Sequence, residues 1–341
     1  MKQSLFLLLL TITVGTVSAK ADNITFADAN VKALCVANWD TNKDGELSTD
    51  EAAAVTTLGT VFKGKTNITT FDELRYFTGV TTIGEDAFRG SSIGPVLTIP
   101  GTVKTIGNYA FNNCKSLTRI ILQEGVESVG WHTFSGPISF LSLPSSLTSM
   151  SSMAVDPYVN ADPSSGIFVP EGDLWLAVYA KPVPAINDYA FYYVFGEGHL
   201  IVPPGCIDAY KAVAGWSHFG EYFELGDVNR DKELDVTDLE ALISYLDGTT
   251  PETFYEDMAD INGDGVVDDA DVQLLRDYLQ SGEGGETGIA SMLHNDADSL
   301  RGKCDGYVYN MKGQVVRRDG SLQGLAKGIY IINGRKYKVI L

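Results

Sequence analysis

Apolar residues recur at a fixed interval along residues 71–150. The segments "TTIGEDAF", "KTIGNYAF" and "ESVGWHTF" follow one another, and short apolar stretches such as "LTIPGTV" and "LSLPSSL" lie between them. Two apolar positions repeat every 23 residues, at Ile83, Ile106 and Val129 and at Phe88, Phe111 and Phe134. A single unit of this length cannot bury its apolar face alone, so stacked coils must bury it against each other. The pattern predicts a solenoid with one parallel strand per coil, in which Pro100 and Pro144 end strands.

The copy "LTIPGTVKTIGNYAFNNCKSL" resembles the BspA-type leucine-rich repeat of bacterial surface proteins along most of its length. Cys114 in this copy reads as a small buried apolar residue. The segment 200–225 resembles the last unit of that family, in which Tyr210, Trp216 and Phe219 would close the apolar end of the stack. A weaker copy, "PAINDYAF", lies at 184–191, and residues 151–185 depart from the repeat. The resemblance implies adhesion or ligand binding on the solenoid surface, with an unknown protein or glycan as ligand.

Three twelve-residue segments have the layout of a calcium-binding loop. The first, "DTNKDGELSTDE" at 40–51, has oxygen-bearing side chains at the required positions and a glycine at the sixth. Helical patterns precede and follow it, which is typical of an EF-hand. Its predicted ligands are Asp40, Asn42, Asp44, Ser48 and Glu51 through their side chains and Glu46 through its carbonyl. The loop has no neighbour in the sequence, so we expect a structural ion that ties down a cap on the first coil, and not a sensor.

The other two loops lie in a duplication within residues 226–282, which we call the paired-loop module. "GDVNRDKELDVTDLEALISYLDG" is echoed by "ADINGDGVVDDADVQLLRDYLQSG", and each copy is a loop followed by a helix. This order resembles the dockerin module, which binds cohesin domains in extracellular assemblies. The resemblance implies a cohesin-like protein partner and two further Ca²⁺ sites. Their ligands would be Asp227, Asn229, Asp231, Glu233 (carbonyl), Asp235 and Asp238, and Asp260, Asn262, Asp264, Val266 (carbonyl), Asp268 and Asp271.

The first loop of the module departs from the pattern, since Lys232 replaces the glycine at its sixth position. That position usually needs a positive φ, which costs a lysine about 1–2 kcal/mol, so we expect the weaker site here. The partner-recognising positions ten and eleven are Val236–Thr237 and Asp269–Ala270, and they differ between the copies. A calcium-stiffened spacer without a partner is the alternative interpretation of the module.

The two ends of the chain carry signals of export. Lys2 and the apolar run "LFLLLLTITVGTV" predict a secretory signal peptide cut after Ala19 or Ala21. The tail "VYNMKGQVV…LAKGIYIINGRKYKVIL" resembles the C-terminal sorting domain of the type IX secretion system, with Asn333–Gly334 between alternating segments as a hairpin signal. A stabilising β cap is the alternative interpretation of this tail.

The net charge of −19 disfavours binding to nucleic acid or an anionic membrane surface. The four cysteines are far apart and indicate no zinc site, and no later apolar stretch predicts a transmembrane helix. No catalytic motif is present, and "GWSHFG", which sets Ser217 beside His218, reads as packing in the terminal coil. We therefore expect a secreted or surface-displayed protein that is not an enzyme. It is either a binding or adhesion protein or a scaffold subunit of a cohesin–dockerin type extracellular assembly, for example one that handles polysaccharide, with the solenoid as spacer.

The predicted fold class is α+β. It combines a short leucine-rich-repeat solenoid with an EF-hand-like cap, a small all-α dockerin-like module and a small C-terminal β domain. The predicted boundaries are 1–21 signal peptide, 22–70 calcium loop and cap, 71–225 repeats, 226–282 module, 283–300 linker and 301–341 β domain.

Overall fold

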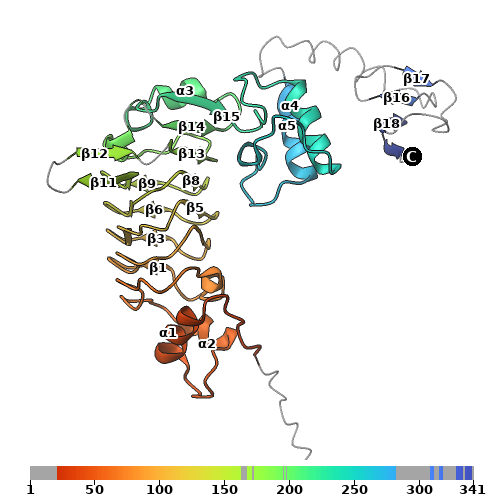
Figure 1. The fold of residues 1–341 in the computed structure, drawn as a ribbon. Helices are drawn as coiled ribbons and strands as arrows, with labels where there is room; N and C mark the ends of the chain where they lie inside the picture. Colours follow the sequence, from red (N-terminus) through yellow and green to blue (C-terminus); the bar gives the residue numbers. More distant parts are fainter. Residues whose placement is uncertain are drawn as a thin grey trace, which may run out of the picture.

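The computed structural model describes residues 21–162, 167–170, 173–194, 196 and 198–281, together with four short strands between 308 and 339. The proposed signal peptide, the linker and the Asn333–Gly334 turn lie outside the described residues. A straight stack of coils forms the body of the molecule, two helices lie at its N-terminal end, and a helix pair lies beside its other end (Figure 1).

The coils are held together by three parallel sheets in the described part of the chain. The six-stranded sheet, here the long sheet, has the order β15-β14-β13-β8-β5-β2. Its strands are β2 (Val96–Ile99), β5 (Arg119–Leu122), β8 (Phe140–Leu143), β13 (Trp175–Val178), β14 (His199–Val202) and β15 (Glu221–Glu224). The short sheet contains β1 (Thr82–Ile83), β3 (Thr105–Ile106), β6 (Ser128–Val129) and β9 (Ser149–Met150), and the corner sheet contains β4 (Phe111–Asn112), β7 (Phe134–Ser135) and β10 (Val155–Asp156).

The register of the sheets reproduces the period of the sequence. Ile83 pairs with Ile106 and Ile106 with Val129, while Leu97 pairs with Ile120 on the long sheet. The prediction of one strand per coil was wrong, because most coils contribute a strand to two or three sheets. Each straight side of a coil pairs with the same side of the neighbouring coil. The strands of two residues could not be recognised in the sequence, because they are too short to show an alternation of apolar and polar positions.

The core is a column of side chains stacked from coil to coil. The rings of Phe62, Phe88, Phe111 and Phe134 stack in turn, with centroids 4.9, 4.9 and 5.7 Å apart. Cys114 is buried as predicted, and its thiol lies 3.2 Å from the Phe88 carbonyl oxygen. Strands β2 and β8 end at the residues that precede Pro100 and Pro144, as the sequence predicts.

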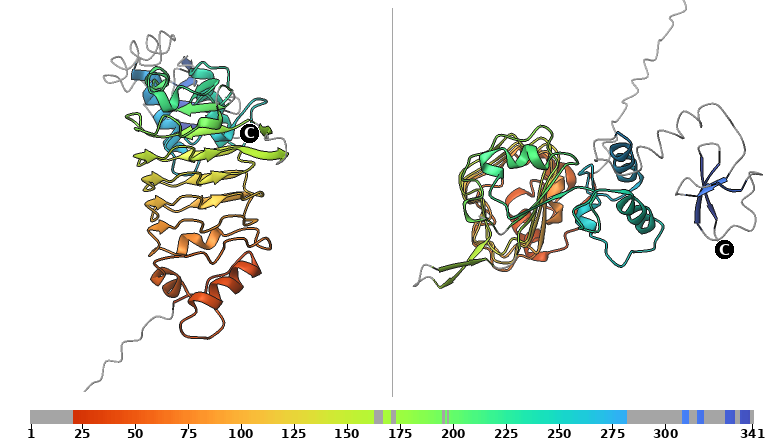
Figure 2. Two further views of the ribbon diagram at one scale, coloured as in Figure 1. Left: turned by 90° about the vertical axis from the view of Figure 1, so that its left-hand side faces the viewer. Right: turned by 90° about the horizontal axis from the view of Figure 1, so that it is seen from above.

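After β10 the chain departs from the repeat, within the stretch 151–185 that the sequence singles out. On the long sheet, Leu141 pairs with Leu176, and the chain between these two partners contains more residues than the chain between the other paired positions. The extra residues include the antiparallel hairpin of β11 (Tyr158–Asp162) and β12 (Ile167–Pro170), which projects from the stack (Figures 1 and 2). The coil then closes with the short helix η2 (Tyr192–Val194) and returns to β14.

The two ends of the stack are covered. At the N-terminal end lie α1 (Ala29–Trp39), α2 (Thr49–Ala54) and η1 (Asp72–Tyr76), and Val31, Cys35 and Leu47 belong to the same core as the coils. At the other end lie α3 (Ile207–Lys211) and η3 (Ala214–Trp216). Tyr210, Trp216 and Phe219 are buried there, which confirms their predicted place at the apolar end.

The paired-loop module contains α4 (Val236–Leu246), η4 (Glu256–Met258) and α5 (Asp269–Ser281). Strand β15 precedes its first loop and the single turn η4 precedes its second, so neither loop follows a full helix, as the sequence indicates. Seen from above, the module lies against one side of the coils (Figure 2). Its core includes residues of the long sheet, namely Phe140, Ala177, Ile201 and Phe223.

The C-terminal strands form a separate antiparallel sheet of order β17-β16-β18-β19 among the described residues. They are β16 (Val308–Asn310), β17 (Val315–Arg317), β18 (Gly328–Ile332) and β19 (Arg335–Val339). The sorting role of this segment stays a prediction.

Candidate functional site

The three predicted calcium loops share one hydrogen-bond template. In each, the first-position carboxylate accepts the N–H of the sixth residue, at 2.9 Å in 40–51, 3.1 Å in 227–238 and 2.9 Å in 260–271. The amide oxygen at the third position accepts the N–H of the fifth residue, and the carboxylate at the fifth accepts the N–H of the seventh. The twelfth-position carboxylate accepts the N–H groups of the third and ninth residues. Loops that differ in sequence therefore turn the same set of oxygens inward.

The first loop lies between α1 and α2, and among the described residues no second loop of this kind lies beside it. Its eighth residue, Leu47, instead accepts the N–H of Ile24 at 2.8 Å, and Asn23 and Ser48 form an isolated antiparallel bridge. Ser48 begins α2 with a capping box, in which its hydroxyl and the Glu51 carboxylate exchange bonds with the backbone. Bonds from the backbone of Ser48 and from Thr41 lower the pKa of Glu51 to about 2. The N-terminal segment thus takes the structural place of a partner loop.

The two loops of the paired-loop module bury part of their negative charge. Asp227, Asp238 and Asp271 are at most 1% exposed. Burial raises the pKa of Asp227 to about 6 and that of Asp238 to about 7, and the nearby Asp231 carboxylate adds to both shifts. Burial also raises the pKa of Asp260. Burying like charges together is costly unless a cation accompanies them.

No group of three or more carboxylate, imidazole or thiolate side chains among the described residues is gathered closely enough to hold a metal ion by itself. Loops of this kind also use amide, hydroxyl and main-chain carbonyl oxygens, so the shared template and the buried carboxylates are the better test. All three loops fit Ca²⁺ by the template, and the two module loops fit it also by their buried carboxylates.

The first module loop contacts the long sheet through two basic residues. The Arg230 guanidinium carbon lies 3.7 Å from the ring centroids of both Trp175, on β13, and Tyr255. The Lys232 ammonium group lies 2.7 Å from a carboxylate oxygen of Glu221, on β15, and 5.3 Å from the ring centroid of Phe223. Both residues have positive φ, of 59° and 71°. The lysine that departs from the loop pattern therefore has a role, because its side chain ties the loop to the solenoid.

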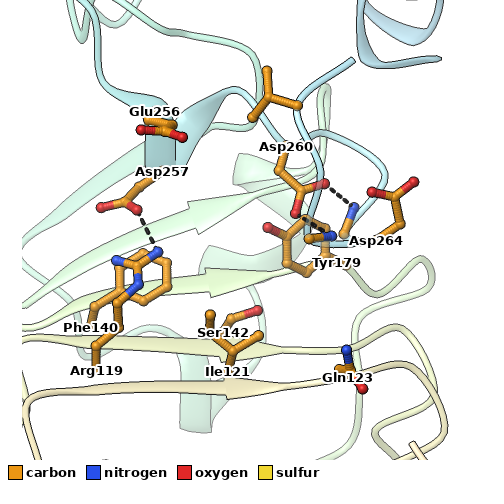
Figure 3. Close-up of a pocket in the computed structure, with 13 residues that line it drawn as sticks. Arg119, Ile121, Gln123, Phe140, Ser142, Tyr179, Glu256, Asp257, Asp260 and Asp264 are labelled. Carbon is orange, nitrogen blue, oxygen red and sulfur yellow. Dashed lines mark hydrogen bonds and ion pairs between the residues drawn. The ribbon is translucent and has the colours of Figure 1, made fainter. Parts of the chain in front are cut away.

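The second module loop lies on the same sheet, over Tyr179. Gly263, with φ of +75°, is so close to the Tyr179 ring that a Cβ added there would lie 2.8 Å from two ring atoms. A cavity of about 330 Å³ separates the rest of the loop from the sheet (Figure 3). Ile121 and Ser142 face it from the sheet, and Asp260 and Asp264 face it from the loop.

An ion pair closes one side of this cavity. The Arg119 guanidinium of β5 lies over the Phe140 ring at 3.7 Å and pairs with Asp257 of η4 at 2.5 Å (Figure 3). Arg230, Lys232 and Arg119 thus connect the module to the sheet at three separate points. The module is fixed to the solenoid by an apolar core and by polar contacts at its rim.

The docked module leaves its predicted recognition positions accessible. Thr237, Asp269 and Ala270 are exposed, and Val236 is half-buried. They lie at the starts of α4 and α5, whereas the solenoid covers the loops and the segment around η4.

The structure brings the sequence-predicted residues together loop by loop, in three separate groups. Sequence reasoning missed the contact residues Arg230, Trp175, Tyr179 and Arg119. A signal was present, because "FLSL", "WLAV" and "HLIV" have apolar residues on both faces of the strand, which is typical of strands buried on both sides.

Comparison with known proteins identifies two regions. A family profile described as "BspA type Leucine rich repeat region" matches residues 59–157 in six copies. A profile described as "Dockerin type I domain" matches residues 225–280. No curated protein matches the chain. In the part of the chain that the structure describes, no helix has the length and apolar character needed to cross a membrane. The chain therefore contains a BspA-type leucine-rich-repeat region followed by a type I dockerin domain.

Proposed function

We propose that this chain is an exported, calcium-stabilised binding protein without catalytic activity, whose solenoid recognises a ligand and whose dockerin domain docks to a cohesin-type protein. The observation that carries the proposal is the shared template of the three loops, two of which lie against the solenoid. Bound Ca²⁺ would offset the buried carboxylate charge and hold each loop in its folded form. The residues that would hold it are the eighteen loop ligands named from the sequence.

Calcium in this scheme is a folding ligand and not a signal. A module of fewer than 60 residues has a marginal core of its own, and an ion that binds only the folded form adds about 2.7 kcal/mol at a hundred times its dissociation constant. The chain adds a second source of stability, since the module shares its core with β8, β13, β14 and β15.

The dockerin domain implies a cohesin-type partner, and the exposure of Thr237, Asp269 and Ala270 supports the starts of α4 and α5 as the docking surface. Export and surface display rest on the leader-like N-terminus and the sorting-like tail. They agree with the extracellular setting that is typical of both identified regions. The absence of catalytic motifs supports a non-catalytic role.

The test is capture of the full chain by immobilised type I cohesin domains, in calcium and in excess chelator. We expect capture in calcium that chelator abolishes and that Thr237→Arg or Asp269→Arg weakens. Glu252→Arg, an exposed position between the two copies, is the matched control and should bind like the parent. No capture by any cohesin would refute the docking role, and equal capture in calcium and in chelator would refute its dependence on calcium.

The second candidate is a scaffold subunit in which docking is the main function and the solenoid is a spacer. The shared core favours it in one respect, because a solenoid joined rigidly to the module would hold a bound partner at a fixed position. A solenoid surface that binds its own ligand distinguishes the two candidates.

A further inference from the structure

One corner of the solenoid carries a row of aromatic side chains far from the calcium loops. In four successive coils, the third residue after the short-sheet strand turns the chain with a positive φ, which is 61° at Asp86, 55° at Tyr109, 47° at His132 and 52° at Met153. The backbones at this corner pair from coil to coil, with His132 N–H donating to Met153 and Met153 N–H to Tyr189, at 3.0 and 2.7 Å. This ladder places the side chains of successive coils in line.

Aromatic rings occupy much of that line. The Tyr109 and His132 rings are stacked with 5° between their planes and centroids 5.8 Å apart. Trp131 meets both rings edge-on, at 4.9 Å from Tyr109 and 4.4 Å from His132. Farther along, Tyr189 and Tyr192 lie 6.1 Å apart. We call these five residues the aromatic ridge.

Three of the five ridge residues are open to solvent, although they are large and partly apolar, and Tyr109 and His132 are half-buried. Trp131 is 39% exposed, Tyr192 43% and Tyr189 55%. The core of the coils does not use these rings, since the stacked phenylalanines fill it.

The docked module does not cover the ridge. Tyr109 lies between β3 and β4, and Trp131 and His132 lie between β6 and β7, at the corner of the short and corner sheets. The module packs on the long sheet. Both surfaces are therefore available in one molecule.

We propose that the aromatic ridge binds a neutral polysaccharide chain, whose sugar rings stack on Trp131, Tyr189 and Tyr192. This inference deepens the proposed function and rests on it, since it names the ligand class of the solenoid. The apolar faces of a sugar ring carry C–H groups that complement the electron-rich face of an aromatic ring. Polar groups flank the rings, among them Arg89, whose guanidinium carbon lies 4.9 Å from the Tyr109 ring centroid, and the exposed Asp188.

Shape and charge favour this ligand over the alternatives. Successive coils rise by about 4.8 Å, and the backbone ladder places one ridge position in each coil, so the ridge is a narrow strip along the stack. A stable protein interface buries about 800 Å² on each partner, which suits a broad patch better than a strip. The net charge of −19 disfavours acidic polysaccharides and nucleic acid.

The experiment is affinity electrophoresis of the full chain, in calcium, through gels that contain one soluble polysaccharide each. The neutral probes are mixed-linkage β-glucan, xyloglucan, galactomannan and starch, and the acidic probes are polygalacturonate and heparin. We expect at least one neutral probe to retard the parent. Trp131→Ala should weaken that binding by about tenfold, which is the scale of losing one aromatic ring that stacks on a nucleic-acid base, and Trp131→Phe should restore most of it.

The matched control is Val96→Ala, an exposed apolar position on β2 that is 43% exposed and lies outside the ridge. It should be retarded like the parent. The proposal would be overturned if no neutral probe retarded the parent, or if acidic probes alone retarded it. It would also be overturned if Trp131→Ala were retarded as strongly as the parent. Cohesin capture is measured on the same samples. A failure of polysaccharide binding can therefore be distinguished from a failure of cohesin docking.

Discussion

Replacement of Arg230 tests the attachment of the dockerin domain to the solenoid. The guanidinium group lies between Trp175 and Tyr255, 3.7 Å from each ring centroid. A cation–π contact contributes about 0.5–2 kcal/mol depending on its desolvation. Arg230→Ala should therefore destabilise the docked state by about 1–4 kcal/mol. Arg230→Gly should cost about 1 kcal/mol less, because glycine adopts the observed φ of 59° without the penalty that alanine has.

The assay is hydrogen–deuterium exchange of residues 221–234 in saturating calcium, which reports opening of this interface. Since 1.4 kcal/mol corresponds to a factor of ten, exchange should accelerate by about fivefold to about a thousandfold in Arg230→Ala. Arg75→Ala is the control, because the Arg75 guanidinium also lies over a tyrosine ring, at 4.8 Å, but on the exposed N-terminal part. If exchange in Arg230→Ala matches that of the parent and of this control, the reasoning about the interface is wrong.

Three further predictions follow from the same contacts. Asp264→Ala should lower the melting temperature in calcium more than Asp231→Ala, because the second module loop has a glycine at its sixth position and should bind the ion more tightly; equal melting of both variants and the parent would contradict this. Gly263→Ala should weaken docking by about 2–5 kcal/mol, because the new Cβ would clash with Tyr179 and the backbone there is left-handed. Gly265→Ala is the control in the same exchange assay. It should show only the cost of the left-handed backbone, because the space around its Cβ is open. Phe111→Ala, in the middle of the ring stack, should destabilise the solenoid by about 3–5 kcal/mol in chemical denaturation, and a loss below about 1 kcal/mol would contradict the packing account.

The solenoid could be predicted from the sequence because its core is periodic. Successive coils need a buried apolar side chain at the same position, which is filled by Phe88, Phe111 and Phe134, so the spacing alone identifies the inward face. The three-sheet cross-section could not be predicted, since β1 or β4 has only two residues and leaves no alternation to read.

The conformation of the three loops was predictable for a different reason. Their oxygen-bearing side chains and tight turns lie within twelve consecutive residues, so local spacing determines the hydrogen-bond template. Contacts between distant segments are harder to predict. No local pattern in the sequence links Arg230 to Trp175, for example.

Docking of the module on the long sheet left two indirect signals. Strands β13 and β14 are apolar on both faces, at Ala177 and Ile201 as well as at the inward positions. In addition, β15 ends at Glu224 and the first loop begins at Asp227, so the connection is too short to let the module move away from the sheet. Together these features point to a covered sheet, but they do not identify the side chains that cover it.

The most direct test of the account compares hydrogen exchange of the full chain in calcium and in excess chelator. The proposal predicts that calcium protects the three loops and also strands β13 and β15, which bind no ion but support the docked module. Unchanged exchange of β13 and β15 on chelation, with no divalent ion bound in equilibrium dialysis, would contradict the claim that calcium holds the dockerin domain on the solenoid.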